Sequence, residues 1–185
     1  SGVVPAISAV IKALTVPGDK VLVQTPVYNC FFSSIRNNGC EMVSSPLVFA
    51  SNTFTIDYED LERKTADPKV KVMLLCNPHN PCGVCHSKES LQRLARICNE
   101  RGVIVVSDEI HAEMVLGGRR HIPFASVSED AAECAITFMA PSKTFNIAGV
   151  VSSYCIIESD KLREKFFGYL SACELDDPSL FSIVA

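Results

Sequence analysis

Lys143 is the residue whose type and setting could do chemistry. It lies in the run Ser142-Lys143-Thr144, shortly after an apolar segment at 135–139. An ammonium group at the mouth of a buried strand is poorly solvated, so the neutral amine becomes accessible. A neutral lysine can form a Schiff base with an aldehyde cofactor. The alternative is a lysine at a helix start that points into water, and Lys143 alone does not decide between the two.

Other polar residues follow predicted strands in the same way. Tyr28 comes after the apolar run 20–24, Asn80 after 70–76, and Asp108 after 103–106. In an α/β fold, ligands bind beyond the carboxyl ends of the strands. One site could therefore gather these residues with Lys143. Each also has a structural explanation, as a turn residue, a helix cap or a rim aromatic, but those explanations do not account for their joint placement.

The elements that would position these residues alternate between helix and strand. The spacing of apolar residues predicts helices at 4–14, 28–38, 57–63, 87–101 and 159–173. Apolar runs predict strands at 20–24, 40–44, 70–76, 103–106, 135–139 and 150–157. We expect Asp57 and Ser87 to be N-caps, and residues 117–133 to be irregular. The alternation predicts an α/β domain of three layers, a mostly parallel sheet flanked by helices.

Composition excludes some classes of protein. The chain has 185 residues, of which 48% are hydrophobic, enough for one ordinary core. A net charge of −4 gives no indication of a nucleic-acid partner. No apolar run reaches the ~18 residues that a membrane span needs. We therefore expect neither a nucleic-acid partner nor a membrane.

The cysteines indicate a reducing compartment. There are nine, an odd number, and several lie within apolar runs, namely Cys76, Cys98, Cys134 and Cys155. This pattern is typical of reduced, buried thiols rather than of a disulfide framework. No basic segment followed by an apolar stretch opens the chain, as a signal peptide would. We expect a cytoplasmic protein.

Both ends of the chain have the character of interior sequence. The chain enters a helical pattern without a starting Met and stops within an apolar run at 182–185. Natural termini are usually polar and frayed. We expect a piece of a longer protein.

A second motif suggests a metal. Residues 82–86 fit the two-cysteine-plus-histidine pattern of haem attachment, and His79, Cys82, Cys85 and His86 could in principle bind zinc. The pattern is short, and the turn that leads into the helix at Ser87 explains the same residues. We expect no metal, and a metal assay on the purified chain tests this expectation.

Three segments carry a family resemblance: Asn77–Gly83, Asp108–His111 and Ser142–Asn146. They resemble the fold-type-I pyridoxal-phosphate enzymes, the class I/II aminotransferase superfamily. Within it the chain is most similar to the bacterial cystathionine β-lyase branch typified by MalY and PatB. The branch-level similarity rests on Asp108–His111 with Met114-Val115 and His121–Pro123, and on Gly2–Pro5 opening a helix.

The resemblance implies a role for each candidate residue around pyridoxal 5'-phosphate. Lys143 matches the lysine that forms the Schiff base and then removes the substrate α-proton. Asp108 matches the carboxylate that keeps the ring nitrogen protonated, since a negative charge favours the charged form. Asn80 matches the donor to the ring hydroxyl. Tyr28 matches the aromatic residue that stacks on the ring.

The remaining matches concern the phosphate and the far side of the ring. Gly2, Val3 and Val4 match a phosphate cradle of backbone amides at a helix N-terminus. Ser142 matches a hydroxyl that can contribute there. His111 stands near the ring hydroxyl, where many aminotransferases carry a tyrosine and where this branch is expected to carry a histidine.

The chain departs from the family pattern at three positions. Ala140 stands where many relatives have a phosphate-binding serine, and Val151 stands where many aminotransferases have a phosphate-binding arginine. Cys82 replaces a usual threonine. The missing arginine argues against an ordinary aspartate aminotransferase and agrees with the lyase branch. It also predicts weaker binding of the phosphate.

The implied activity is a carbon–sulfur β-lyase that converts cystathionine or related cysteine S-conjugates to a thiol, pyruvate and ammonia. An aminotransferase acting on an amino acid and a keto acid is one alternative, and a non-catalytic regulatory protein that keeps the fold is another. Residues 1–185 would be the central part of the large domain of a homodimeric enzyme. The N-terminal segment and the C-terminal small domain, with the arginine that binds the substrate carboxylate, would lie outside the chain. The fragment alone is expected to be inactive.

Overall fold

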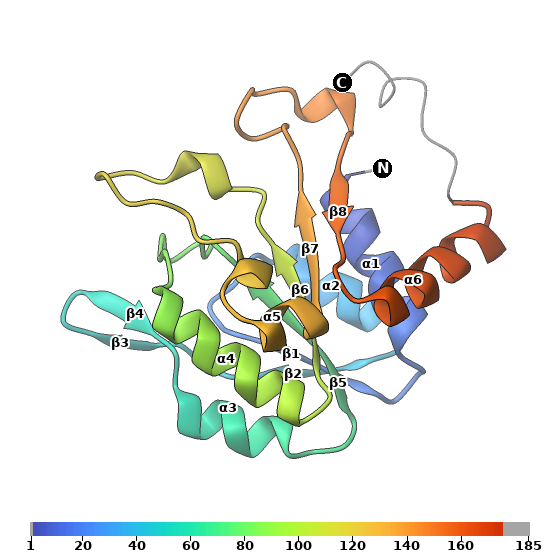
Figure 1. Ribbon diagram of the computed structural model, residues 1–185, viewed down its shortest axis with the longest axis horizontal. Coiled ribbons are helices and arrows are strands. Elements are labelled where there is room, and N and C mark those ends of the chain that lie inside the picture. Colours follow the sequence, from blue (N-terminus) through green and yellow to red (C-terminus); the bar gives the residue numbers. More distant parts are fainter. Residues whose placement is uncertain (1, 176–185) are drawn as a thin grey trace.

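A six-stranded sheet forms the centre of the computed structural model, which describes residues 2–175 (Figure 1). The strand order is β2-β1-β5-β6-β7-β8, and all neighbours are parallel except β7 and β8. The strands are β1 (Lys20–Val23), β2 (Glu41–Ser44), β5 (Val70–Cys76), β6 (Ile104–Asp108), β7 (Ala135–Met139) and β8 (Tyr154–Ile156). The order reverses between β1 and β5, and in open sheets such a switch point is where ligands bind.

Helices cover both faces of this sheet (Figure 1). One face carries α1 (Val3–Leu14), α2 (Cys30–Asn37) and α6 (Asp160–Ala172). The other carries α3 (Tyr58–Thr65), α4 (Lys88–Glu100) and α5 (Glu129–Cys134). Short 3₁₀ turns lie at Ala112–Met114, Phe124–Ser126 and Ala148–Val150. The predicted three-layer α/β architecture is confirmed.

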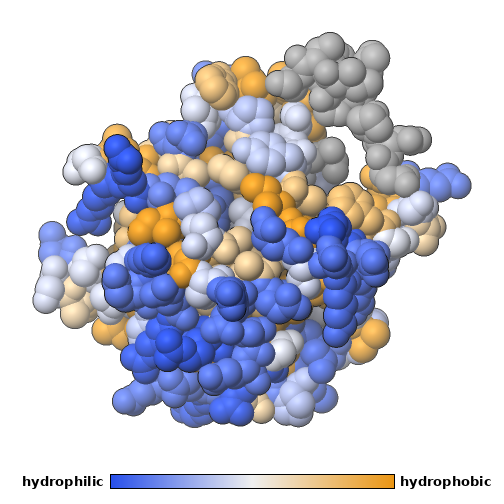
Figure 2. All heavy atoms as spheres, viewed as in Figure 1, coloured by the Kyte–Doolittle hydropathy of each residue, from blue (hydrophilic) through white to orange (hydrophobic). Residues whose placement is uncertain are grey.

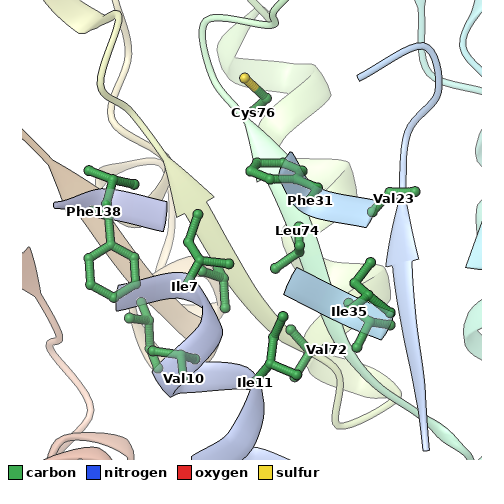
Figure 3. Close-up of a cluster of buried hydrophobic side chains, with 14 of the residues drawn as sticks. Ile7, Val10, Ile11, Val23, Phe31, Ile35, Val72, Leu74, Cys76 and Phe138 are labelled. Carbon is green, nitrogen blue, oxygen red and sulfur yellow. The ribbon is translucent and has the colours of Figure 1, made fainter. Parts of the chain in front are cut away.

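Alternate residues of β5 pack into opposite layers. Val72 and Leu74 join the cluster beneath α1 and α2, where they meet Ile7 and Phe31 (Figure 3). Met73 and neighbouring Leu75 point the other way, into the cluster beneath α4. A strand buried on both faces must be apolar throughout, which explains why 70–76 is nearly continuous in hydrophobic residues.

The helix caps follow the sequence prediction. The Oδ1 of Asp57 accepts a hydrogen bond from Asp60 N at 3.0 Å, and the Oγ of Ser87 accepts one from Ser90 N at 3.2 Å. Each bond satisfies an amide that has no partner within its own helix. Helix α2 is shorter than predicted: it runs from Cys30 to Asn37, so Tyr28 lies before it, in the loop that follows β1.

The local structure differs from the sequence analysis at three further points. The segment 117–133 is not wholly irregular, because α5 begins within it at a cap where Ser128 Oγ accepts a hydrogen bond from Ala131 N. A hairpin of β3 (Val48–Ala50) and β4 (Thr53–Thr55) was not predicted. Strand β8 begins only at Tyr154, because a 3₁₀ turn and the left-handed residue Val151 precede it.

The nine cysteines all lie within the described residues and are all free. Cys76, Cys98 and Cys134 are buried as predicted, whereas Cys155 is half-buried. Within residues 2–175, no helix combines the length and the apolar character that a membrane crossing requires.

Candidate active site

A cavity of about 390 Å³ lies at the carboxyl edge of the sheet, against the start of α1. Every candidate residue singled out from the sequence lines it. Those residues are Gly2, Val3, Val4, Tyr28, Asn80, Asp108, His111, Ser142 and Lys143. They come from segments that are far apart in the chain, so the parallel sheet is what brings them together.

The turn after β5 positions Asn80. Within this turn, Asn77 N donates to the carbonyl of Asp108 at 3.0 Å, and the Asn77 side chain donates to the carbonyl of Ile122, also at 3.0 Å. The backbone N–H of Asn80 points back to the sulfur of Cys76, at 3.3 Å. The turn is therefore tied to β6 on one side and to the loop after residue 117 on the other.

His79 joins this turn to the loop that carries Tyr28. Its Nε2 lies 2.9 Å from the carbonyl oxygen of Pro26. Burial lowers the pKa of His79, which keeps the ring neutral, and in the Nε2–H tautomer the ring donates this hydrogen bond. The loops after β1 and β5 are thus held together on the two sides of the switch point.

Asp108 is the buried carboxylate of the cavity. It ends β6, opposite Cys76 in the strand register, and is only 5% exposed. Burial raises its pKa to about 6, and Glu109 adds to the rise, whereas the backbone N–H of Ile110 (3.2 Å from Oδ1) and the charge of Lys143 oppose it. A cationic group in the cavity would therefore stabilise the ionised form of Asp108.

For Lys143, the structure decides between the two alternatives that the sequence left open. Its side chain is exposed, as in a lysine that points into water, rather than poorly solvated at the mouth of a strand. Strand β7 ends at Met139, and residues 141–147 form a tight turn in which Phe145 N donates to the carbonyl of Pro141 and Ile147 N to that of Ser142. The lysine thus stands beyond the strand end, on an open side of the cavity. Its charge still reaches Asp108 and His111, since it lowers the pKa of both.

The start of α1 supplies free amides. Gly2 is the N-cap and makes no side-chain capping bond, so the N–H groups of Val3 and Val4 have no partner within the helix. Pro5 has no N–H to offer. A helix N-terminus of this kind binds anions through its amides and its dipole.

The chain can now be compared with known proteins. The model of the family "Aminotransferase class I and II" matches residues 1–168. The chain belongs to this family.

Relatives within the family are similar over the whole chain. "Cystathionine beta-lyase PatB" of Bacillus subtilis is 46% identical over 184 residues, which are 100% of this chain and 48% of PatB. "Protein MalY" of Escherichia coli is 33% identical over 99% of this chain and 46% of its own. The pyridoxal-phosphate-bound C-S lyase of Staphylococcus hominis superimposes with a TM-score of 0.91 at 33% identity, over 99% of this chain and 46% of that one. The predicted resemblance to the PatB and MalY branch is confirmed, and the chain spans about half the length of these relatives.

Two of the positions that depart from the expected family pattern lie next to the cavity. Ala140 is buried just before Ser142, which lines the cavity. Val151 lies beside Gly2, because a Cβ built on that glycine would meet its Cγ1 at 3.8 Å. A valine rather than an arginine therefore stands beside the helix start.

Sequence reasoning missed some of the residues that build this cavity. Cys76, Ile110 and Ala148 also line the cavity. Beneath it, the fully buried Glu109 accepts hydrogen bonds from Ser107 Oγ at 2.8 Å and from Phe124 N at 2.8 Å, and its other oxygen lies 2.6 Å from His121 Nε2. A charged residue within a strand-end motif signals such a network, but two of its partners, His121 and Phe124, are 12 and 15 residues away in the sequence.

A second cavity of about 430 Å³ adjoins the first. The two share Asn80 and His111, and the second continues along Met114, Leu116 and Arg119. In the described part of the chain, no group of three or more His, Cys, Asp or Glu side chains could hold a metal ion, and this includes the residues of the 79–86 motif.

Proposed function

We propose that this chain is part of a pyridoxal-phosphate-dependent carbon–sulfur β-lyase that acts on cystathionine or related cysteine S-conjugates. The observation that carries the proposal is the gathering of all the predicted cofactor residues around one cavity. The names of PatB and of the Staphylococcus hominis lyase support it, because they describe the same chemistry in relatives of this chain.

The chemistry of the lining fits the cofactor at both of its ends. Free amides at the start of α1 suit a phosphate dianion. The buried carboxylate of Asp108 suits a protonated ring nitrogen, whose charge would lower the pKa of that carboxyl from about 6. Between them, Lys143 supplies an amine that can hold an aldehyde covalently.

When bound, the cofactor supplies an acceptor for the electrons of a bond broken at the substrate α-carbon. Lys143 Nζ takes the α-proton, and a thiolate then leaves the β-carbon. Asn80 would donate to the ring hydroxyl, Tyr28 would stack on the ring face, and His111 would lie near the same hydroxyl. Ser142 contributes to the phosphate cradle. With the uptake of water, the products are a thiol, pyruvate and ammonia.

We also propose that residues 1–185 form the central part of the large domain of a homodimeric enzyme. Residues 1 and 176–185 lie outside the described structure. An N-terminal segment and a C-terminal small domain, which would bind the substrate carboxylate, belong in this proposal to the rest of the polypeptide. The fragment alone should therefore be inactive, and the whole protein is the right material for assays.

Pyruvate release tests the lyase proposal. We expect the full-length protein to form pyruvate from L-cystathionine without any added keto acid, and Lys143→Ala to abolish this activity. An aminotransferase, the alternative within the same family, would instead need a keto acid to turn over. Turnover that depends on a keto acid, without pyruvate release, would rule out the lyase. Absence of both activities would favour a regulatory protein.

A further inference from the structure

Cys76 is a cavity residue that the proposed mechanism does not use. It is the last residue of β5, is 3% exposed and lines the same cavity as Lys143. Figure 3 shows it at one edge of the core cluster, beyond Phe31 and Leu74. In the strand register it lies opposite Asp108. It therefore stands where the hydrophobic core ends and the site begins.

The thiol of Cys76 contacts the next turn at two points. The backbone N–H of Asn80 donates to its sulfur at 3.3 Å, and the sulfur lies 3.3 Å from the carbonyl oxygen of Pro78, to which the S–H can donate. A thiol is a weak donor and a weak acceptor, so it can make both contacts at once. The two contacts span the turn that presents Asn80 to the cavity.

The contact to the Pro78 carbonyl requires that the thiol keep its proton. Burial raises the pKa of Cys76 to about 12, and the neighbouring Asp108 carboxylate adds to the rise. The group therefore remains an S–H donor throughout the physiological range, and it does not become a thiolate that would attack an aldehyde.

We propose that Cys76 is a positioning residue: its thiol fixes the backbone from Pro78 to Asn80 and so sets the Asn80 side chain against the ring hydroxyl of the cofactor. This inference rests on the proposed function, because it assigns a purpose to the position of Asn80. No proton transfer or covalent step is assigned to the sulfur.

The inference has a spectroscopic consequence. A hydrogen bond donated to the ring oxygen reduces the negative charge on that oxygen. The oxygen then stabilises the proton on the nitrogen of the lysine–cofactor linkage less strongly, so this proton is lost at a lower pH. If Cys76 is replaced and the Asn80 side chain moves away from the ring oxygen, the oxygen loses this hydrogen bond and stabilises the proton more strongly. The pH midpoint of the cofactor's visible absorption change then rises.

The experiment uses the full-length protein loaded with pyridoxal phosphate. We expect Cys76→Ala to raise the absorbance midpoint by roughly 0.5–1 pH unit and to weaken cofactor binding by up to about tenfold, the range of one ordinary hydrogen bond. Cys76→Ser keeps a donor and an acceptor and should stay within about 0.3 unit of wild type. Cys98→Ala is the matched control, since it removes a fully buried sulfur in the opposite core layer, where the one hydrogen-bond-type contact of the sulfur among the described residues is to Met73 Sδ, at 3.9 Å.

The outcomes separate the two proposals. A raised midpoint in Cys76→Ala alone supports the positioning role. An unchanged midpoint in Cys76→Ala, or an equal shift in Cys98→Ala, overturns it and leaves the lyase proposal intact. A wild-type protein that binds no cofactor overturns the proposed function, and the inference with it.

Discussion

Asp108 shows how one residue can serve the site at the expense of the fold. Its carboxyl is buried, and within the described residues it accepts one backbone hydrogen bond, from Ile110. A buried carboxylate without a cationic partner disfavours its charged form, which is why its pKa rises to about 6. The ionised carboxylate therefore destabilises the fold when no cation is near it, and a cation bound in the site would stabilise it.

The pH dependence of stability follows from this shift. An acid whose folded pKa lies above its unfolded value stabilises the fold below the unfolded value, near 3.8, and loses this contribution as the pH rises through about 6. We expect Asp108→Asn to make the cofactor-free protein more stable at pH 8, by up to about 3 kcal/mol, with little effect at pH 4. The same substitution should weaken cofactor binding. Urea unfolding at the two pH values measures the first effect, and equal stability of the two proteins at pH 8 would contradict it.

The sequence predicted the residues of the site better than it predicted their environment. Asp108 ends a strand, Asn80 and Lys143 follow strands, and a parallel sheet brings strand ends together whatever the details of its loops. The sequence left the exposure of Lys143 undecided between two alternatives, because it depends on how far the turn carries the residue beyond β7. Cys76 was overlooked because its pattern is that of an ordinary core residue.

At the scale of elements, the core strands and long helices were predictable and the peripheral elements were not. Strand β5 and helix α4 have continuous or periodic apolar patterns that reflect their burial. The hairpin β3–β4 is largely exposed, and its turn uses the left-handed residues Ser51 and Asn52. Helix α5 has only six residues and a serine cap. Elements that bury little leave a weak pattern in the sequence.

The network around Glu109 joins two of these elements. Its carboxylate holds His121 and the backbone of Phe124, and so it anchors the loop between β6 and α5 beneath the cavity. We expect Glu109→Ala to lower the unfolding free energy of the full-length protein by about 3–5 kcal/mol, because buried partners are left without an acceptor. Glu113→Ala, in the same segment but exposed, should change it by less than about 0.5 kcal/mol. Chemical denaturation measures both, and similar effects of the two variants would contradict the anchoring role.

At the scale of the whole molecule, polar and apolar surfaces are segregated. Figure 2 shows a largely hydrophilic surface over α3 and α4, whereas apolar side chains gather elsewhere on the same face. Exposed apolar residues line the cavities around the site: Met114 and Leu116 on one side, and Phe145 and Tyr154 on the other. The chain spans about half the length of PatB. We propose that the rest of the polypeptide covers these exposed apolar residues.

The covalent attachment of the cofactor to Lys143 tests the central claim most directly. The full-length protein is loaded with pyridoxal phosphate, reduced with borohydride and digested, and the modified peptide is located by mass spectrometry. We expect the modification on the peptide that contains Lys143, and none there in Lys143→Ala. Attachment to another lysine alone, or no attachment at all, would contradict the assignment of this site.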